Sequence, residues 1–197
     1  MRENLFRGKR RDNGEWVYGS LFVGFKKSYI CPEAIAMYNF DGALCLGGFV
    51  EVSPESVGQY TGLHDATKWE NLPEKEQQEF LRIHKKEDWN GKKIFEGDIV
   101  KQTFEKAIRE PFEYDLYGED VGTVVIYGED VGPVVLLPSK GVCIKNPISL
   151  RKTDGEVDIS GKKLKMYKEV CSGRCEIIGN IHDNPELLLE SKEECNT

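Results

Sequence analysis

Long apolar segments are missing from this chain of 197 residues. The longest apolar runs, such as Val134–Leu137, span only a few residues, whereas a membrane-spanning helix needs about 20. The first eleven residues are charged and lack the apolar stretch of a secretory signal, so we expect a cytoplasmic protein with no membrane association. A hydrophobic content of 39% beside 31% charged residues is typical of a folded, soluble protein.

Histidine is rare, and the common catalytic motifs are absent. No two histidines have the spacing that places a metal-binding pair on one helix face, since the three are His64, His84 and His182. The sequence has no phosphate-binding glycine loop, dinucleotide fingerprint, nucleophile elbow or zinc-protease motif. We therefore expect a protein that is not an enzyme, with no catalytic residue and no cofactor.

Three polar groups allow a second interpretation. His182-Asp183 could form an acid–base pair, because histidine titrates near neutral pH, but a helix-capping loop is the simpler interpretation. The carboxylate pairs Glu119-Asp120 and Glu129-Asp130 could bind a cation or flank a glycosidic bond. Adjacent carboxylates in turns are more often solvated loop tips, and this is our expectation for both pairs.

Six cysteines could indicate a disulfide framework. Without a secretory signal, reduced thiols are the better interpretation. The one spacing that resembles a metal site is Cys171-x-x-x-Cys175. Structural zinc usually requires two such pairs, so we expect no metal.

The net charge of −7 is unevenly distributed. Residues 1–27 hold seven basic and three acidic side chains, whereas residues 105–130 hold eight acidic and two basic ones. An acidic chain is a poor general binder of nucleic acid. A basic face could still bind an acidic partner or the chain's own acidic segment, or it could be a solvated hairpin edge; its candidate residues are Arg7, Lys9, Arg10 and Arg11.

The N-terminal part has the pattern of short β-strands. Asp12-Asn13-Gly14 is a turn signal, which predicts a hairpin over residues 1–25. Gly19, in the returning strand, indicates a bulge or a close backbone approach. Further short strands follow, and we expect this β unit to end near Leu63.

A helix is predicted over residues 72–87. Asn71 and Glu74 have the spacing of a capping box, and acidic residues precede basic ones as the helix dipole favours. Phe80, Leu81 and Ile83 form a short apolar stripe.

A ten-residue segment is nearly repeated, because Tyr117–Ile126 and Tyr127–Leu136 agree at eight positions. Two copies are too few for a solenoid. We expect two β-rich runs joined by a turn at Gly128–Asp130. Pro133 lacks a donor for the strand ladder, which predicts an edge strand or a bulge.

Three motifs together carry a family resemblance. Asn90-Gly91 favours a two-residue hairpin turn, and Gly97-Asp98 forms a second turn before the strand that begins with Ile99. Together with Val57–Leu63 and Ile178–Leu188, these motifs resemble the YopX family of phage and prophage proteins.

The resemblance implies a mainly β protein in which a short-stranded β unit is followed by an SH3-like barrel, with an inserted helix. The expected boundaries are 1–63, 64–90 for the helical insertion and 91–190 for the barrel. The implied role is that of an accessory protein in the host cytoplasm that binds an unknown protein partner or self-associates. Gln59 and Tyr60 are either a buried connector or a recognition loop between the two β units. The alternative is a small-barrel module that binds nucleic acid through the basic N-terminal face.

Overall fold

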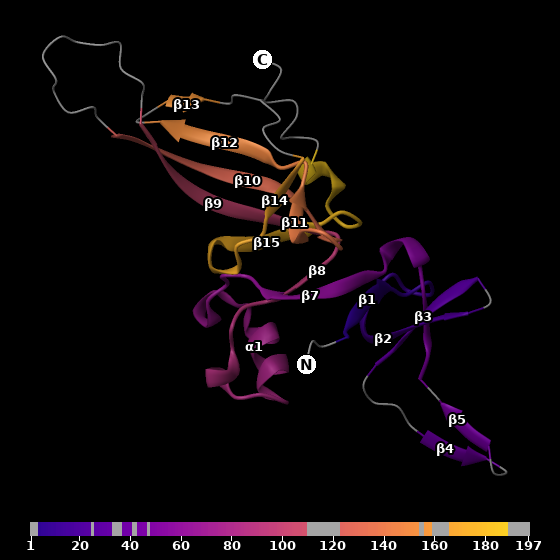
Figure 1. Ribbon diagram of the computed structural model, residues 1–197. Helices are drawn as coiled ribbons and strands as arrows, with labels where there is room; N and C mark the ends of the chain where they lie inside the picture. Colours follow the sequence, from indigo (N-terminus) through magenta and orange to yellow (C-terminus); the bar gives the residue numbers. More distant parts are fainter. Residues whose placement is uncertain are drawn as a thin grey trace, which may run out of the picture.

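The computed structural model describes residues 4–24, 26–32, 37–40, 43–46, 48–109, 123–153, 156–158 and 166–188. The chain is mainly β, which confirms the predicted class. Two large antiparallel sheets lie one beyond the other, and the only α-helix in the described part of the chain lies beside the first sheet (Figure 1). None of the helices described is long and apolar enough to cross a membrane.

The N-terminal sheet has the strand order β6-β3-β2-β1-β7-β8. Its strands are β1 (Phe6–Lys9), β2 (Trp16–Gly24), β3 (Lys27–Cys31), β6 (Val50–Val52), β7 (Gly58–His64) and β8 (Lys93–Phe95), with the 3-10 turn η1 (Pro54–Ser56) before β7. The predicted first hairpin is confirmed, with Lys9 opposite Trp16. Gly19 is a close backbone approach, because a Cβ there would lie 2.0 Å from the carbonyl oxygen of Cys31.

This sheet curls until its edge strand β6 meets the end of β1. Arg10 forms a β-bridge with Val52, and the N–H of Ser53 donates to the carbonyl of Lys9 at 2.9 Å. Val52 and Ile30 are fully buried inside the curl. The N-terminal unit is therefore closed on itself at this end.

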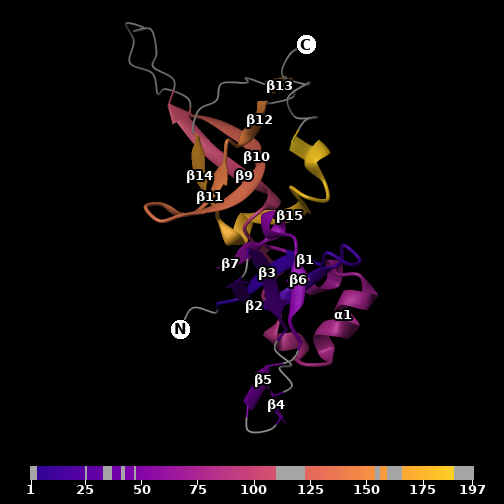
Figure 2. The same cartoon turned by 90° about the vertical axis from the view of Figure 1, so that its right-hand side faces the viewer.

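A separate hairpin projects from the N-terminal sheet. It consists of β4 (Met37–Phe40) and β5 (Ala43–Leu46), and it lies in the chain between β3 and β6. Both views show it pointing away from the body of the sheet (Figures 1 and 2). Among the described residues it pairs with no third strand.

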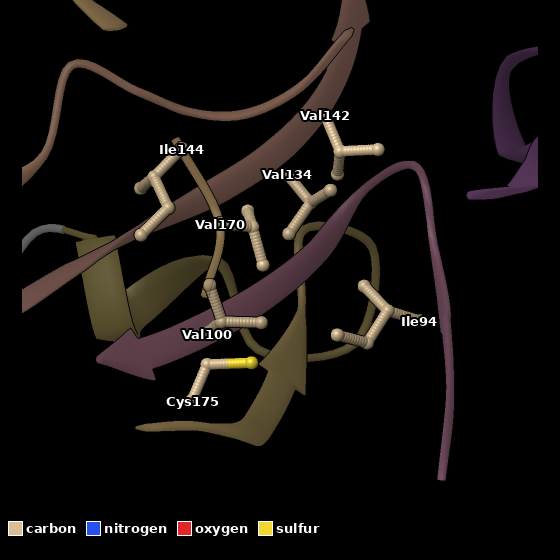
Figure 3. Close-up of a cluster of buried hydrophobic side chains, with 7 residues drawn as sticks. All are labelled: Ile94, Val100, Val134, Val142, Ile144, Val170 and Cys175. Carbon is tan, nitrogen blue, oxygen red and sulfur yellow. The ribbon is translucent and has the colours of Figure 1, made fainter. Parts of the chain in front are cut away.

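The C-terminal sheet surrounds the main hydrophobic core. Its strands are β9 (Asp98–Arg109), β10 (Thr123–Leu137), β11 (Gly141–Lys145), β12 (Ile148–Thr153), β13 (Glu156–Asp158), β14 (Tyr167–Glu169) and β15 (Cys175–Asn180). The short 3-10 turns η4 (Ser172–Arg174) and η5 (Pro185–Leu188) flank β15. The core consists of Ile94, Val100, Val134, Val142, Ile144, Val170 and Cys175 (Figure 3).

The side chain of Gln102 links β9 to the end of the edge strand β14. Gln102 of β9 donates through Nε2 to the carbonyl of Glu169 at 3.2 Å, and its Oε1 accepts from the N–H of Cys171 at 2.6 Å. No backbone ladder joins β14 to β15 in the part of the chain that the structure describes. The SH3-like barrel therefore stays a prediction.

Strand β10 differs from the expectation based on the repeat. It runs unbroken from Thr123 to Leu137, so the turn predicted at Gly128–Asp130 is wrong. The reason is that β9 pairs with it from Thr123 to Pro133 and keeps it extended. Pro133 is neither at an edge nor in a bulge but lies where the other neighbour of β10 changes from β12 to β11.

The helical segment is shorter than predicted. It comprises η2 (Trp69–Asn71), α1 (Glu74–Leu81) and η3 (Lys86–Asp88). The capping prediction is wrong: Pro73 is the N-cap, without a side-chain hydrogen bond. The expected stripe is also wrong, because Leu81 and Ile83 are 50% and 82% exposed, and only Phe80 packs, against Trp69 and Trp89.

The hairpin turn expected at Asn90-Gly91 is absent, because β8 pairs with β7 across the whole helical segment. Gly91 has a φ of 104°, and a Cβ there would lie 2.0 Å from the carbonyl oxygen of Asp65. This glycine is therefore required by a close backbone approach. The pairing also places β8, which follows the helical segment in the chain, within the N-terminal sheet.

Candidate functional site

The turn at Gly97 joins the two sheets. Gly97 has a φ of 82°, which favours glycine. Its N–H donates to the carbonyl of Val134 at 3.0 Å, and its carbonyl accepts from the N–H of Ile181 at 2.9 Å. The predicted glycine-aspartate turn is confirmed, and it fixes the direction in which β9 leaves β8.

A buried ion pair crosses the junction beside this turn. Arg7 of β1 and Asp98 of β9 lie 2.7 Å apart (Nη2 to Oδ1), and their side chains are 9% and 2% exposed. The guanidinium lies over the rings of Trp16 and Phe95, at 4.7 and 5.0 Å from their centroids. Such stacking suits the planar, weakly hydrated guanidinium.

The carboxylate of Asp98 has further donors. The N–H of Phe95 donates to Oδ2 at 2.7 Å, and the Asn180 amide lies 3.5 Å from Oδ1. Burial raises the pKa of Asp98, while the charge of Arg7 and these hydrogen bonds oppose that shift. Arg7 also donates to the carbonyl of Glu96 at 3.2 Å, but its buried Nε has no hydrogen-bond partner among the described residues.

A second polar contact lies next to the first. Lys9 forms an ion pair with Asp183, and the indole N–H of Trp16 donates to the other oxygen of that carboxylate at 2.8 Å. Burial alone would raise the pKa of Asp183, but the hydrogen bonds from Lys9 and Trp16 lower it below the ordinary value. The pKa of His182 is lowered by burial and by the charges of Lys9 and Arg7.

The predicted basic residues are thus engaged within the chain. Arg7 and Lys9 contact Asp98 and Asp183, and the pairs Arg10–Asp12 and Arg11–Glu51 lie nearer the surface. The partners of Arg7 and Lys9 come from β9 and the turn after β15 rather than from residues 105–130. Sequence reasoning missed these partners, although Asp98 and Asp183 both belong to the motifs that carry the family resemblance.

Gln59 and Tyr60 belong to β7, next to the junction. Tyr60 is 5% exposed and packs against Phe95, with ring centroids 5.6 Å apart. The carbonyl of Gln59 accepts from the N–H of Glu96 at 3.0 Å. This placement agrees with the connector interpretation, and Tyr60 offers little surface to a partner.

Ion pairs and hydrogen bonds hold the two sheets together at the junction. The carboxylates of Asp98 and Asp183 both accept hydrogen bonds from cationic and neutral donors. The expectation for Glu129-Asp130 is wrong at Asp130, which is fully buried, accepts from Ser149 at 2.6 Å and pairs with Lys168. The pair Glu119-Asp120 lies outside the described residues.

The described histidine, cysteine and acidic side chains were candidates for metal binding, and the cysteines also for thiol chemistry. Within the described ranges, no group of three or more histidine, cysteine or acidic side chains is placed to hold a metal ion. Cys31, Cys143, Cys171 and Cys175 are free thiols. Burial raises the pKa of Cys175 to about 11.

An open groove of about 820 Å³ lies beside the junction. One wall comes from the helical segment, with Phe80, His84 and Trp89, and the other comes from the sheet, with Tyr18, His64 and Phe95. Arg7 and Asp98 also line it. The ion pair Lys92–Glu76, at 2.9 Å, ties the two walls together.

Asp65 fixes the base of the helical segment and is 4% exposed. Its Oδ1 accepts from the N–H groups of Thr67 and Lys92 at 3.0 and 2.8 Å. Its Oδ2 accepts from the Thr67 hydroxyl at 2.6 Å and from the N–H of Ile177 at 3.2 Å. The indole of Trp89 adds a bond to the carbonyl of Thr67 at 2.9 Å, so both ends of the segment are held together.

Comparison with models of known protein families shows the family of this chain. A family model described as YopX protein matches residues 86–189, which is more than half of the chain. The chain belongs to the YopX family. No curated protein and no solved structure gives a significant match. The part matched by the YopX model includes Asp98, Asn180 and Asp183, whereas Arg7 and Trp16 of the junction lie before it.

Proposed function

We propose that this YopX-family chain is a phage-encoded accessory protein that acts in the host cytoplasm without catalysis, by binding an extended segment of a partner protein in the groove. The observation that carries the proposal is the pair of facing aromatic walls. Grooves lined by aromatic rings take up proline or aromatic side chains of extended peptides, because flat rings offer contact area at little entropic cost.

The geometry of the groove supports recognition by a rigid surface. Asp65 holds the helical wall at its base, and the Arg7–Asp98 pair holds the sheet wall to β9. A surface that is fixed before binding loses less conformational entropy when its partner arrives. Tyr18, 48% exposed and 5.6 Å from Phe95 between ring centroids, is the most accessible aromatic residue of the sheet wall.

Photo-crosslinking tests this function. A benzophenone amino acid is placed at Tyr18 or, as a matched control, at Tyr127, which is 52% exposed on β10. After irradiation of host cells, the Tyr18 position should give a discrete adduct with one host or phage protein, and the Tyr127 position should not.

Specificity for the groove is checked by adding Trp89→Ser, which removes a ring of the opposite wall and should abolish the adduct. The same adduct at both positions, or an adduct unaffected by Trp89→Ser, would contradict groove binding.

Nucleic-acid binding through the basic N-terminal face has weaker support. Each of Arg7, Lys9, Arg10 and Arg11 has a carboxylate of this chain as its partner, which reduces the charge available for phosphate groups. A salt titration of RNA and DNA binding separates the two functions. Micromolar affinity at low salt with a steep dependence on salt concentration would favour the alternative.

A further inference from the structure

The outer face of β2, β3 and β6 carries three aromatic side chains, of which Phe22 and Phe49 are exposed and Tyr29 is half-buried. Phe22 and Tyr29 are opposite each other on β2 and β3, and Phe49 precedes β6. Phe22 and Phe49 pack edge to face with centroids 4.9 Å apart, yet they remain 41% and 38% exposed. We call Phe22, Tyr29 and Phe49 the aromatic patch.

Charged groups and a hollow border this patch. Glu51 pairs with Arg11 at 2.9 Å and with Lys27 at 2.7 Å. A shallow hollow of about 390 Å³ lies beside Phe49 and is lined by Arg10, Arg11 and Glu51 among others. An apolar centre with a charged rim is the usual composition of a protein interface.

The hairpin β4–β5, which we call the arm, leaves the sheet between β3 and β6, two of the strands that carry the patch. Residues 34–46 contain a single charged residue, Asp41. An isolated two-stranded hairpin is only marginally stable in water, and a third strand or an apolar surface is needed to stabilise it. The arm points away from its own sheet (Figures 1 and 2). The exposed fractions of Phe22 and Phe49 show that the patch is left uncovered within the chain.

We infer that two copies of this chain associate by each laying its arm on the aromatic patch of the other. The chain itself supplies both complementary surfaces: an arm almost without charge and an uncovered aromatic face. Because β3 and β6 carry both, a two-fold axis beside the sheet brings each arm to the opposite patch, as a closed symmetric dimer requires. This surface is separate from the groove, so dimerisation and groove binding can fail independently.

Sedimentation of the full chain tests the inference. The wild type should sediment with twice the chain mass of 22.4 kDa. The dimer of the double variant Phe22→Ser/Phe49→Ser should have a dissociation constant about tenfold or more above that of the wild type, because buried aromatic side chains dominate interface energies. Val23→Ser is the matched control, because Val23 is adjacent in β2, 73% exposed and on the other face. A wild type that stays monomeric up to about 100 μM would overturn the inference.

A mixing experiment tests the pairing of arm and patch. One variant replaces residues 34–47 by a short Gly/Ser linker and keeps the patch, and the other is Phe22→Ser/Phe49→Ser with its arm intact. Each alone should be monomeric at the concentration where the wild type is dimeric. The mixture can form only one of the two arm–patch contacts, so it should form a heterodimer at a higher concentration than the wild type needs, where neither variant alone associates. A mixture that associates no more than either variant alone, or a dimer of either variant alone, would show that another surface holds the copies.

Hydrogen exchange on the wild type provides a measurement that needs no variant. The amides of residues 37–46 should exchange more slowly as the protein concentration rises through the dimerisation range. Exchange that is independent of concentration would overturn the inference even if the patch variants fail to fold.

Discussion

The carboxylate of Asp65 accepts a hydrogen bond at 3.2 Å from the backbone N–H of Ile177, across 112 residues of sequence. The same carboxylate accepts from the N–H of Lys92. One buried side chain therefore joins the end of β7, the start of β8 and the closing strand β15. The helical segment between them is a closed loop with its ends fixed.

The helical segment should be removable. Replacing residues 68–90 by a short Gly/Ser turn should leave a folded protein with an unchanged β-sheet circular dichroism signal, since Leu72 is the one buried hydrophobic residue described there. Its burial contributes only about 1.5–3 kcal/mol before entropy is subtracted. The comparison variant is Asp65→Ala in the full chain. It should lower the free energy of unfolding, measured in urea, by about 1–3 kcal/mol. Aggregation of the shortened chain would mean that the segment covers part of the core.

Breaking the Arg7–Asp98 pair should be costly. Arg7→Met leaves the buried carboxylate of Asp98 without its cation, and such a loss typically lowers the free energy of unfolding by about 3–5 kcal/mol. Arg11→Met, which breaks the exposed pair with Glu51, should change it by less than about 1 kcal/mol. Denaturant titrations of both variants measure the difference. Equal midpoints would mean that the Arg7–Asp98 pair does not hold the two sheets together.

Gly97 should resist substitution. Its φ of 82° disfavours any side chain, and a Cβ would lie 3.4 Å from Cδ1 of Ile181. Gly97→Ala should therefore destabilise the protein by about 1 kcal/mol or more. Gly24→Ala is the control, because its Cβ would enter open space. An unchanged denaturant midpoint for Gly97→Ala would mean that the turn does not need its left-handed conformation.

Stability should rise with pH in the range where His182 titrates. Burial and the charges of Lys9 and Arg7 lower its pKa in the folded state, with Asp183 and Glu55 opposing. The unfolded chain therefore binds more protons between this lowered pKa and about 6.5, so stability is lost as pH falls through that window. Melting temperatures from about pH 5 to 7.5 measure the slope. His182→Gln should reduce it, and an identical slope would assign the effect to another group.

The thiols should stay reduced and the fold should not depend on a metal. Melting temperatures with and without reductant or chelator should agree. A lower melting temperature with reductant would indicate a stabilising disulfide, and a lower one with chelator would indicate a bound metal. Cys175 has a pKa of about 11, so only about one thiol in a thousand is ionised at pH 8. Iodoacetamide should label it far more slowly than the half-buried Cys171, as mass spectrometry of peptides can show.

Local signals predicted some turns correctly, but not the helix cap at Asn71 or the hairpin turn at Asn90-Gly91. Asp12–Gly14 and Gly97 turn the backbone where the sequence indicates, because the required dihedral angles depend on those residues themselves. The repeat around Gly128 predicted a turn that does not form, because the ladder to β9 outweighs the local preference. The segment predicted as one helix is divided into α1 and two 3-10 turns, and Phe80 packs onto Trp69 and Trp89 from those turns and their flanks.

The site required information that the sequence does not contain. Arg7 is an ordinary basic residue in the sequence, and its burial depends on Trp16, Phe95 and Asp98, which come together only in the fold. Likewise, the groove exists because β7 and β8 pair across the helical segment. The motifs contain Asp98 and Asp183 of the junction but not their partners Arg7 and Lys9.

The closed base at Asp65 and Lys92 makes the segment between them exchangeable. The N–H of Asp65 donates to the carbonyl of Lys92 at 2.9 Å, so the two ends stay adjacent whatever the length of chain between them. A segment of different length carrying other aromatic or charged residues could replace residues 68–90 without moving either sheet. In the proposed groove, such a replacement would change the helical wall that contacts the partner and leave the sheet wall unchanged.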